Sequence, residues 1–131
     1  IMAKIKKIIN IEDTVIKHCE INRALGYNGY PDAVCAKNAE EGLDMIEAAI
    51  AEGEPFELLI TDMEFPVNGA VDSKAGVFVM EELERRGIHL PIIVCSSVRY
   101  NFSEQKNVVG CVFYNKNRDL NWNFREILGK I

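Results

Sequence analysis

The sequence predicts a single α/β domain, a doubly wound (βα)5 sandwich built around a five-stranded parallel sheet. Its 131 residues are enough for one domain with one hydrophobic core. Short apolar runs alternate with segments whose apolar residues recur at helical spacing. The runs are apolar throughout rather than at every second position, as expected for parallel strands covered on both faces. No linker or internal repeat divides the chain, so residues 1–131 are expected to form one domain.

Five apolar runs are the predicted strands, and they occupy residues 5–11, 32–36, 56–61, 91–95 and 110–114. Five helices are predicted between and after them, at 14–26, 38–50, 76–86, 98–109 and 120–128. The second helix has the clearest pattern, because Asn38 is a good N-cap and apolar residues follow it at steps of four, three and four. The segment 98–109 is more polar and has the weakest pattern. The segment 64–75 contains Pro66 and Gly69 and is predicted to be a long loop.

Side-chain positions follow from the same patterns. The apolar face of the first helix is predicted to hold Val15, Cys19 (or His18) and the pair Ala24-Leu25. The third helix should turn its apolar residues inward; these are Val79, Met80 and Leu83. No two of the four cysteines have a C-x-x-C spacing, and most follow or interrupt apolar runs. We therefore expect reduced, mostly buried thiols.

Composition excludes some classes of function. Charged residues make up 27% of the chain and the formal net charge is −5, so clustered basic residues for nucleic-acid phosphates are not expected. No apolar stretch approaches the roughly 20 residues that a membrane span requires. The first residues have no signal-peptide pattern. The sequence therefore predicts a cytoplasmic protein that binds a protein or a small molecule.

Polar residues follow the predicted strands where ligands of open α/β sheets bind, at the carboxyl ends. Glu12 and Asp13 follow the first strand, Asp62 the third, Ser96 the fourth and Lys116 the fifth. Several carboxylates without a His or Cys ligand suit a hard cation that prefers oxygen, such as Mg²⁺. The sequence thus predicts a site of carboxylates, a hydroxyl and an ammonium at one edge of the sheet.

The chain resembles the receiver domains of two-component response regulators, the CheY-like superfamily, over nearly its whole length. The motifs that carry the resemblance are Ile-Ile-Asn-Ile-Glu-Asp at 8–13, Leu-Leu-Ile-Thr-Asp-Met-Glu-Phe-Pro at 58–66, Pro-Ile-Ile-Val-Cys-Ser-Ser at 91–97, and Lys116. The resemblance implies the flavodoxin-like strand order 2-1-3-4-5.

The resemblance also implies a role for each residue of the site. Asp62 would be the phosphoacceptor, with Ser96 and Lys116 contacting the phosphoryl group. Glu12, Asp13, Asp62 and the backbone carbonyl of Glu64 would hold Mg²⁺. Such a chain is not an enzyme acting on other molecules, because it catalyses only its own phosphoryl transfer and autodephosphorylation.

The remaining implications concern signalling. Ser96 and an aromatic residue on the last strand, Phe113 with Tyr114 as the alternative, would form the switch. The implied partners are a sensor histidine kinase or a phosphotransfer protein, and a downstream protein target or output domain. A phosphorylation-dependent homodimer is left open. Direct binding to nucleic acid or to a membrane is not expected.

Four departures from the family pattern accompany the resemblance, and the mildest is Glu12 in place of the commoner Asp, which keeps the charge. Asn117 stands where the family has a proline in a cis peptide bond, and a cis bond before a non-proline residue costs about 3–4 kcal/mol, so a trans bond is expected. The segment 64–75 is longer than usual, and the spacing from Gly110 to Lys116 is one residue short.

Two rival functions remain open. The first is a degenerate receiver, a protein-interaction module that no longer cycles phosphate. The second is a flavin- or nucleotide-binding enzyme on a similar sheet, although Glu12-Asp13 after the first strand would repel a phosphate that no metal bridges.

Overall fold

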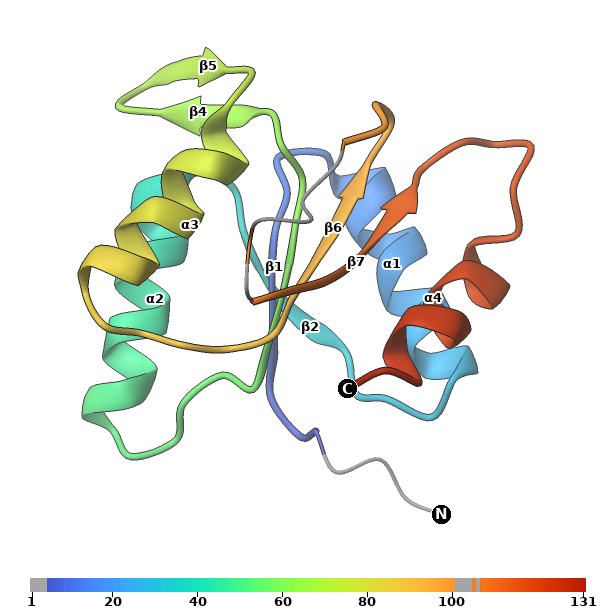
Figure 1. Ribbon diagram of the computed structural model, residues 1–131, viewed down its shortest axis with the longest axis horizontal. Helices are drawn as coiled ribbons and strands as arrows, with labels where there is room; N and C mark the ends of the chain where they lie inside the picture. The colour runs from blue at the N-terminus through green and yellow to red at the C-terminus, as the bar shows by residue number, and fades with distance from the viewer. Residues whose placement is uncertain (1–4, 101–104, 106) are drawn as a thin grey trace.

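The computed structural model describes residues 5–100, 105 and 107–131. Its central sheet has five parallel strands in the order β2-β1-β3-β6-β7 (Figure 1). The strands are β1 (Ile8–Ile11), β2 (Ala33–Ala36), β3 (Leu58–Thr61), β6 (Ile92–Ser96) and β7 (Val108–Phe113). Counted within this sheet alone, the order is 2-1-3-4-5. The predicted fold class and strand order are therefore confirmed.

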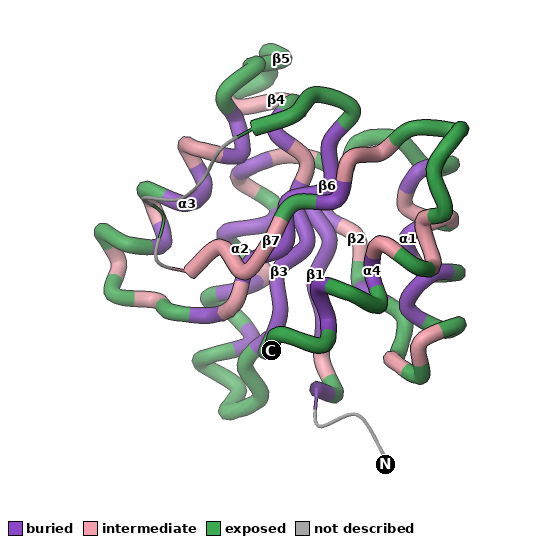
Figure 2. The backbone as a smooth tube through the Cα atoms, turned by 45° about the vertical axis from the view of Figure 1, so that its right-hand side comes forward, coloured by how far each residue is buried: buried purple, intermediate pink, exposed green. Residues whose placement is uncertain are grey.

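Four helices in the described part of the chain cover the sheet in two layers. The helices are α1 (Val15–Tyr27), α2 (Ala39–Ala51), α3 (Ala75–Arg85) and α4 (Leu120–Leu128). Helices α2 and α3 pack on one face, and α1 and α4 pack on the other, so that the sheet lies between two hydrophobic cores (Figure 1). All residues of β1, β3 and β6 are buried, as continuous apolar runs predict for covered parallel strands (Figure 2).

Local signals in the sequence explain the helices that were predicted well. Helix α2 begins after Asn38, whose side-chain oxygen accepts a 2.8 Å hydrogen bond from the Glu41 N–H. Helix α3 buries Val79, Met80 and Leu83, as predicted. No helix in the described part of the chain is long and apolar enough to cross a membrane.

The predicted helix at 98–109 is wrong for the residues that can be checked. Residues 98–100 are not helical, and Val108 and Val109 belong to β7. The β-branched run that begins at Val108 extends the strand two residues earlier than predicted, with a register shift opposite Ile92 and Ile93. The remainder of the predicted helix, at 101–104 and 106, lies outside the described residues.

The predicted loop at 64–75 contains a β-hairpin. Strand β4 (Phe65–Val67) pairs antiparallel with β5 (Ala70–Asp72), and Asn68 and Gly69 form the turn with φ of 52° and 84°. Positive φ at both positions is the requirement of a type I′ turn, for which Asn-Gly is the preferred sequence. Phe65 is fully buried against α2 and α3, whereas all of β5 is exposed.

The buried face of α1 differs from the prediction. Val15 is 62% exposed and Cys19 is exposed, whereas Lys17, Ile21, Ala24 and Leu25 are buried. The spacing of Ile21, Ala24 and Leu25 determines which face turns inward, and Lys17 lies one turn before Ile21 on that face. The expectation of mostly buried thiols is also wrong in part: all four cysteines are free, but Cys19 and Cys111 are exposed and only Cys95 is fully buried.

Candidate functional site

The carboxyl ends of three neighbouring strands bring the first residues of the site to one level. Strand β1 pairs with β3 so that Ile11 lies opposite Thr61, and Thr61 lies opposite Val94 of β6. The residues that follow Ile11, Thr61 and Val94 are Glu12, Asp62 and Cys95, so these three residues lie at the same level of the sheet. Side chains alternate between the two faces of a sheet, and Ile60 and Cys95 both belong to the core under α1 and α4. Glu12 and Asp62, placed by the same alternation, face α1.

Lys17 of α1 joins these three strand ends. Its Nζ lies 3.0 Å from Glu12 Oε1 and 3.1 Å from Asp62 Oδ2, and it donates a 2.7 Å hydrogen bond to the main-chain carbonyl of Cys95. The side chains of Lys17 and Glu12 are 7% and 1% exposed, whereas that of Asp62 is 17% exposed. The buried ammonium thus holds the two carboxylates together, and Asp62 is the carboxylate that solvent reaches.

Burial and charge determine the ionisation of this group. Burial raises the pKa of Glu12, although the nearby Lys17 ammonium opposes that shift. Burial lowers the pKa of Lys17, but the acidic groups around it, among them the Glu12 and Asp62 carboxylates, raise the pKa above its ordinary value. Lys17 is therefore a fixed positive charge at neutral pH.

Asp62 is held by both of its carboxylate oxygens. Oδ1 accepts a 2.7 Å hydrogen bond from the Met63 N–H, and Oδ2 faces Lys17. The first turn of α3 contacts the residue after Asp62, because the Gly76 N–H donates a 3.1 Å hydrogen bond to the Met63 carbonyl. A carboxylate fixed in this way and partly open to solvent can act as a nucleophile.

The other predicted metal ligands are placed differently. Asp13 and Glu64 follow β1 and β3, as predicted, but both are exposed. Both carboxylate oxygens of Glu12 already have partners within the protein. Oε1 forms an ion pair with Lys17, and Oε2 accepts a hydrogen bond from the Thr14 N–H.

Ser96 and the two aromatic candidates lie near the end of the sheet. The Ser96 hydroxyl is buried and accepts a 3.1 Å hydrogen bond from the Val98 N–H. The Phe113 ring is 4.5 Å from the Arg99 guanidinium. The Tyr114 ring is 5.1 Å from Lys17 Nζ, and the Tyr114 hydroxyl donates to Glu20 of α1. Tyr114, the alternative in the prediction, is thus the aromatic residue in contact with the ammonium of the site.

Lys116 is exposed, and it makes no hydrogen bond or ion pair with any residue in the described part of the chain. It lies in a turn organised by Asn115, whose side-chain oxygen accepts from the Asn117 N–H and whose carbonyl accepts from Arg118. The bond between Lys116 and Asn117 is trans, as expected, since the described residues contain no cis peptide bond. The sequence therefore identified an ammonium at this site but not the lysine that the structure places there.

Sequence reasoning missed Lys17, although a signal was present. Lys17 precedes Ile21 by four residues and Ala24 by seven, so a correct phase for α1 puts it on the buried face. A lysine on an otherwise apolar inward face needs a buried anionic partner, and Glu12 at the end of the preceding strand, five residues earlier, is the buried carboxylate that the structure places there.

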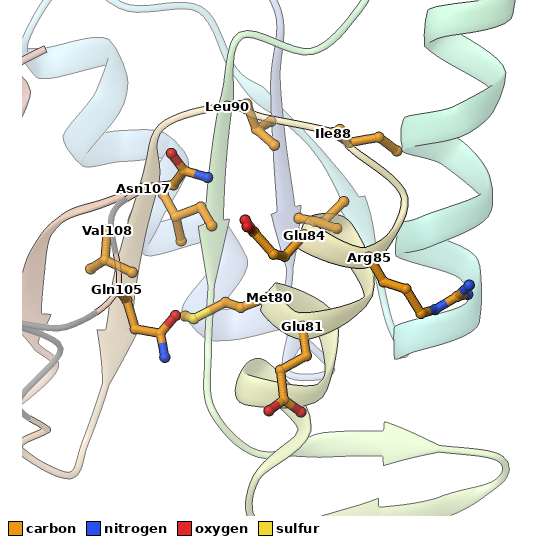
Figure 3. A pocket seen from close by; sticks show the side chains of 11 residues that line it. Met80, Glu81, Glu84, Arg85, Ile88, Leu90, Gln105, Asn107 and Val108 are labelled. Atoms are coloured by element: carbon orange, nitrogen blue, oxygen red, sulfur yellow. The ribbon is translucent and has the colours of Figure 1, made fainter.

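A cavity of about 400 Å³ lies elsewhere in the molecule and is separate from this site (Figure 3). It lies between the end of α3 and the first residues of β6 and β7, with Met80, Ile88, Leu90 and Val108 among its lining residues. These are the amino ends of the strands, opposite to Asp62, and no predicted site residue lines the cavity.

Comparison with known proteins supports the fold. No protein-family model matches the sequence, and no curated protein matches it. A CheY-like response regulator receiver domain protein from Methanospirillum hungatei JF-1 is similar in structure, with a TM-score of 0.68 and 20% identity over 97% of this chain and 94% of that one.

Two further solved structures are similar. The phosphorylated cyanobacterial phytochrome response regulator RcpA superimposes with a TM-score of 0.69 and 20% identity, covering 95% of this chain and 89% of that chain. The Mn²⁺-bound form of response regulator Rcp1 gives a TM-score of 0.64 and 17% identity, covering 95% and 90% of the two chains. The chain therefore has the receiver-domain fold.

The predicted magnesium ligands do not fit a cation together in this arrangement. Among residues 5–100, 105 and 107–131, no three His, Cys, Asp or Glu side chains form a group that could hold a metal ion. The space between Glu12 and Asp62 holds the Lys17 ammonium, which lies within 3.1 Å of both carboxylates. A metal shared by these two carboxylates would have to displace Lys17.

Proposed function

We propose that this chain, which has the fold of response-regulator receiver domains, accepts a phosphoryl group on Asp62 from a sensor histidine kinase or a phosphotransfer protein. The observation that carries the proposal is the placement of Asp62. It is a carboxylate fixed by a main-chain N–H and an ammonium at the carboxyl end of β3, and 17% of its side chain is exposed. The receiver fold and the order of acidic residues along the chain support the same function.

The proposed step is a direct transfer of a phosphoryl group from the donor to Asp62. A carboxylate oxygen of Asp62 attacks phosphorus and forms an acyl phosphate. The bond from phosphorus to the donor breaks, and the imidazole nitrogen of a phosphohistidine, or acetate from acetyl phosphate, leaves with the bonding electrons. Positive charge beside the acceptor stabilises the negative charge on the phosphoryl oxygens during transfer. In this proposal the chain catalyses only its own phosphorylation and dephosphorylation.

A signal would leave the site through its neighbours on the last strand. Tyr114 touches Lys17 and donates to Glu20 of α1, and Phe113 next to it packs against Arg99. A phosphoryl group on Asp62 adds negative charge beside Lys17 and so alters the environment of Tyr114. We propose that the surface around β7 and α4 is read by a downstream protein or an output domain.

Intact mass spectrometry after incubation with acetyl phosphate tests the proposal. The wild type, Asp62→Asn and the exposed control Asp44→Asn are each incubated without metal, with Mg²⁺ and with Mn²⁺. We expect one added phosphoryl group on the wild type and on Asp44→Asn, and none on Asp62→Asn. No adduct on the wild type under any of these conditions would reject phosphoacceptance and leave a protein-interaction module.

A further inference from the structure

Three oxygen atoms surround the Lys17 ammonium, one from each strand end. They are Glu12 Oε1, Asp62 Oδ2 and the Cys95 carbonyl oxygen, at 3.0, 3.1 and 2.7 Å from Nζ. The Cys95 carbonyl oxygen accepts a hydrogen bond from the ammonium, and the two carboxylate oxygens form ion pairs with it. The lysine is therefore seated in the site and is not a surface side chain that happens to lie nearby.

Burying the Lys17 charge has a free-energy cost that an apolar side chain at this position would avoid. Transferring an ammonium and a carboxylate from water to a protein interior carries a large desolvation penalty, and apolar residues of similar volume are often as stable or more so. The rest of the buried face of α1 is apolar and consists of Ile21, Ala24 and Leu25. A charge at position 17 thus interrupts a face that would pack without it.

The one partner of Lys17 that solvent reaches is Asp62. Glu12 is 1% exposed and Lys17 is 7% exposed, whereas the Asp62 side chain is 17% exposed. A donor that approaches Asp62 from solvent would find the ammonium behind the accepting carboxylate. Lys116, to which the family resemblance assigned the contact with the phosphoryl group, is exposed in the turn after β7 and does not contact Asp62.

We infer that Lys17, rather than Lys116, supplies the ammonium that neutralises Asp62 and contacts the phosphoryl group transferred to it. The inference rests on the proposed function of Asp62. When Asp62 is esterified, the negative charge at the site passes from its carboxylate to the phosphoryl oxygens, and Lys17 remains within reach of that charge. No proton has to move, since the ammonium is charged before and after transfer.

Rates of phosphorylation by acetyl phosphate separate the two lysines. Lys17→Met removes the ammonium, Lys116→Met removes the alternative partner, and Lys6→Met is the matched control, because Lys6 is exposed before β1 at the opposite edge of the sheet. We expect Lys17→Met to slow phosphorylation about 100-fold, the size of effect typical for removing one charge-stabilising donor. Lys6→Met should stay within about twofold of the wild type. A 100-fold loss in Lys116→Met with a normal rate in Lys17→Met would overturn the inference while leaving phosphoacceptance on Asp62 intact.

Loss of folding must be separated from loss of chemistry. Lys17→Met leaves Glu12 buried without its counter-ion, so the double variant Lys17→Met/Glu12→Gln, which removes both charges, is measured beside it. Far-ultraviolet circular dichroism establishes that each variant is folded. The inference requires that the double variant be folded and also slow, whereas a folded double variant with a normal rate contradicts it.

A second measurement does not depend on phosphorylation. In ¹H–¹⁵N spectra selective for lysine ammonium groups, Lys17 should give a slowly exchanging signal that is absent in Lys17→Met and shifted in Asp62→Asn. An Asp62→Asn spectrum with an unshifted Lys17 signal rejects the contact, whether or not the wild type accepts phosphate. If Asp62→Asn shifts the Lys17 signal but the wild type accepts no phosphate, the contact is real and the proposed function is rejected. The phosphoryl role of Lys17 is then rejected as well, and Lys17 and Asp62 form a structural ion pair.

Discussion

The backbone of Gly76 lies directly against the main-chain carbonyl of Asp62. A Cβ atom at position 76 would be 2.7 Å from that oxygen and 2.6 Å from the Met63 sulfur. The first turn of α3 can therefore approach the residues after β3 only because position 76 has no side chain.

Gly76→Ala should destabilise the protein even though alanine is the better helix former. The new methyl group would meet main-chain atoms that cannot move without shifting Asp62, and overpacking of this kind costs about 1–3 kcal/mol in the free energy of unfolding. Urea denaturation measures the change. Gly26→Ala is the matched control within α1, since nothing lies within 4 Å of its added Cβ, and it should raise stability by about 0.5–1 kcal/mol. A gain in stability from Gly76→Ala would contradict this packing.

Lys17→Met should lower the free energy of unfolding by about 3–5 kcal/mol, because Glu12 would remain buried without its ion-pair partner. Adding Glu12→Gln should recover most of that loss, since the double variant buries neither charge. Chemical denaturation of the single and double variants, analysed as a double-mutant cycle, gives the coupling between the two residues. Additive effects would show that the ion pair contributes nothing to stability.

Stability should fall on acidification through the titration of His18. Burial lowers the pKa of His18, with the charge of Asp32 opposing the shift. Asn10 Nδ2 lies 2.8 Å from the imidazole Nδ1 and Asn22 Nδ2 lies 3.3 Å from Nε2, so a doubly protonated ring could accept from neither amide. Because the unfolded chain binds the proton more readily, the stability that neutral His18 provides is complete above the unfolded pKa of about 6.5 and is lost as the pH falls below it.

Denaturation midpoints measured from pH 7.5 to 5 test this pH dependence. His18→Gln should flatten the curve over that range. His89→Gln, which changes the only other histidine of the sequence at an exposed position, should leave the slope as in the wild type. Equal slopes in the wild type and His18→Gln would assign the acid sensitivity to other groups.

The four thiols should react at very different rates. Cys95 is fully buried, and burial, with a smaller opposing contribution from Lys17, raises its pKa to about 12. Cys19 and Cys111 are exposed. With iodoacetamide at pH 8, peptide mass spectrometry should find Cys19 and Cys111 labelled before Cys95, which should be labelled only as the chain unfolds. Labelling of Cys95 at the rate of Cys19 would mean that the core under α1 opens readily.

Patterns with a local physical cause could be predicted from the sequence. The covered parallel strands follow from uninterrupted apolar runs, and α2 follows from the Asn38 cap and its apolar spacing. The hairpin at 64–75 could have been predicted as well, because Asn68-Gly69 is the preferred type I′ turn sequence. It was missed because Pro66 and the small residues were read only as signs of a loop.

The site was predictable only in part, because the positions of its carboxylates and of its lysine depend on different features of the sequence. Glu12 and Asp62 meet because strand ends align, and strands could be located from hydrophobicity. Lys17 depends on the rotation of α1, and the prediction placed Val15 and Cys19, which are exposed, on the inward face. The family spacing placed Lys116 at the site, whereas in the structure Lys116 lies exposed in the turn that Asn115 organises.

The hydrogen bond from Lys17 to the Cys95 carbonyl joins residues 78 positions apart in the chain. This separation has a consequence for the order of events during synthesis. A ribosome that has released α1, β1 and β3 has already delivered Glu12, Lys17 and Asp62, but the third oxygen around the ammonium arrives only with β6. Long-range contacts of this kind form late, because the intervening chain must first be ordered. A nascent chain that ends before β6 therefore lacks the third oxygen around the Lys17 ammonium.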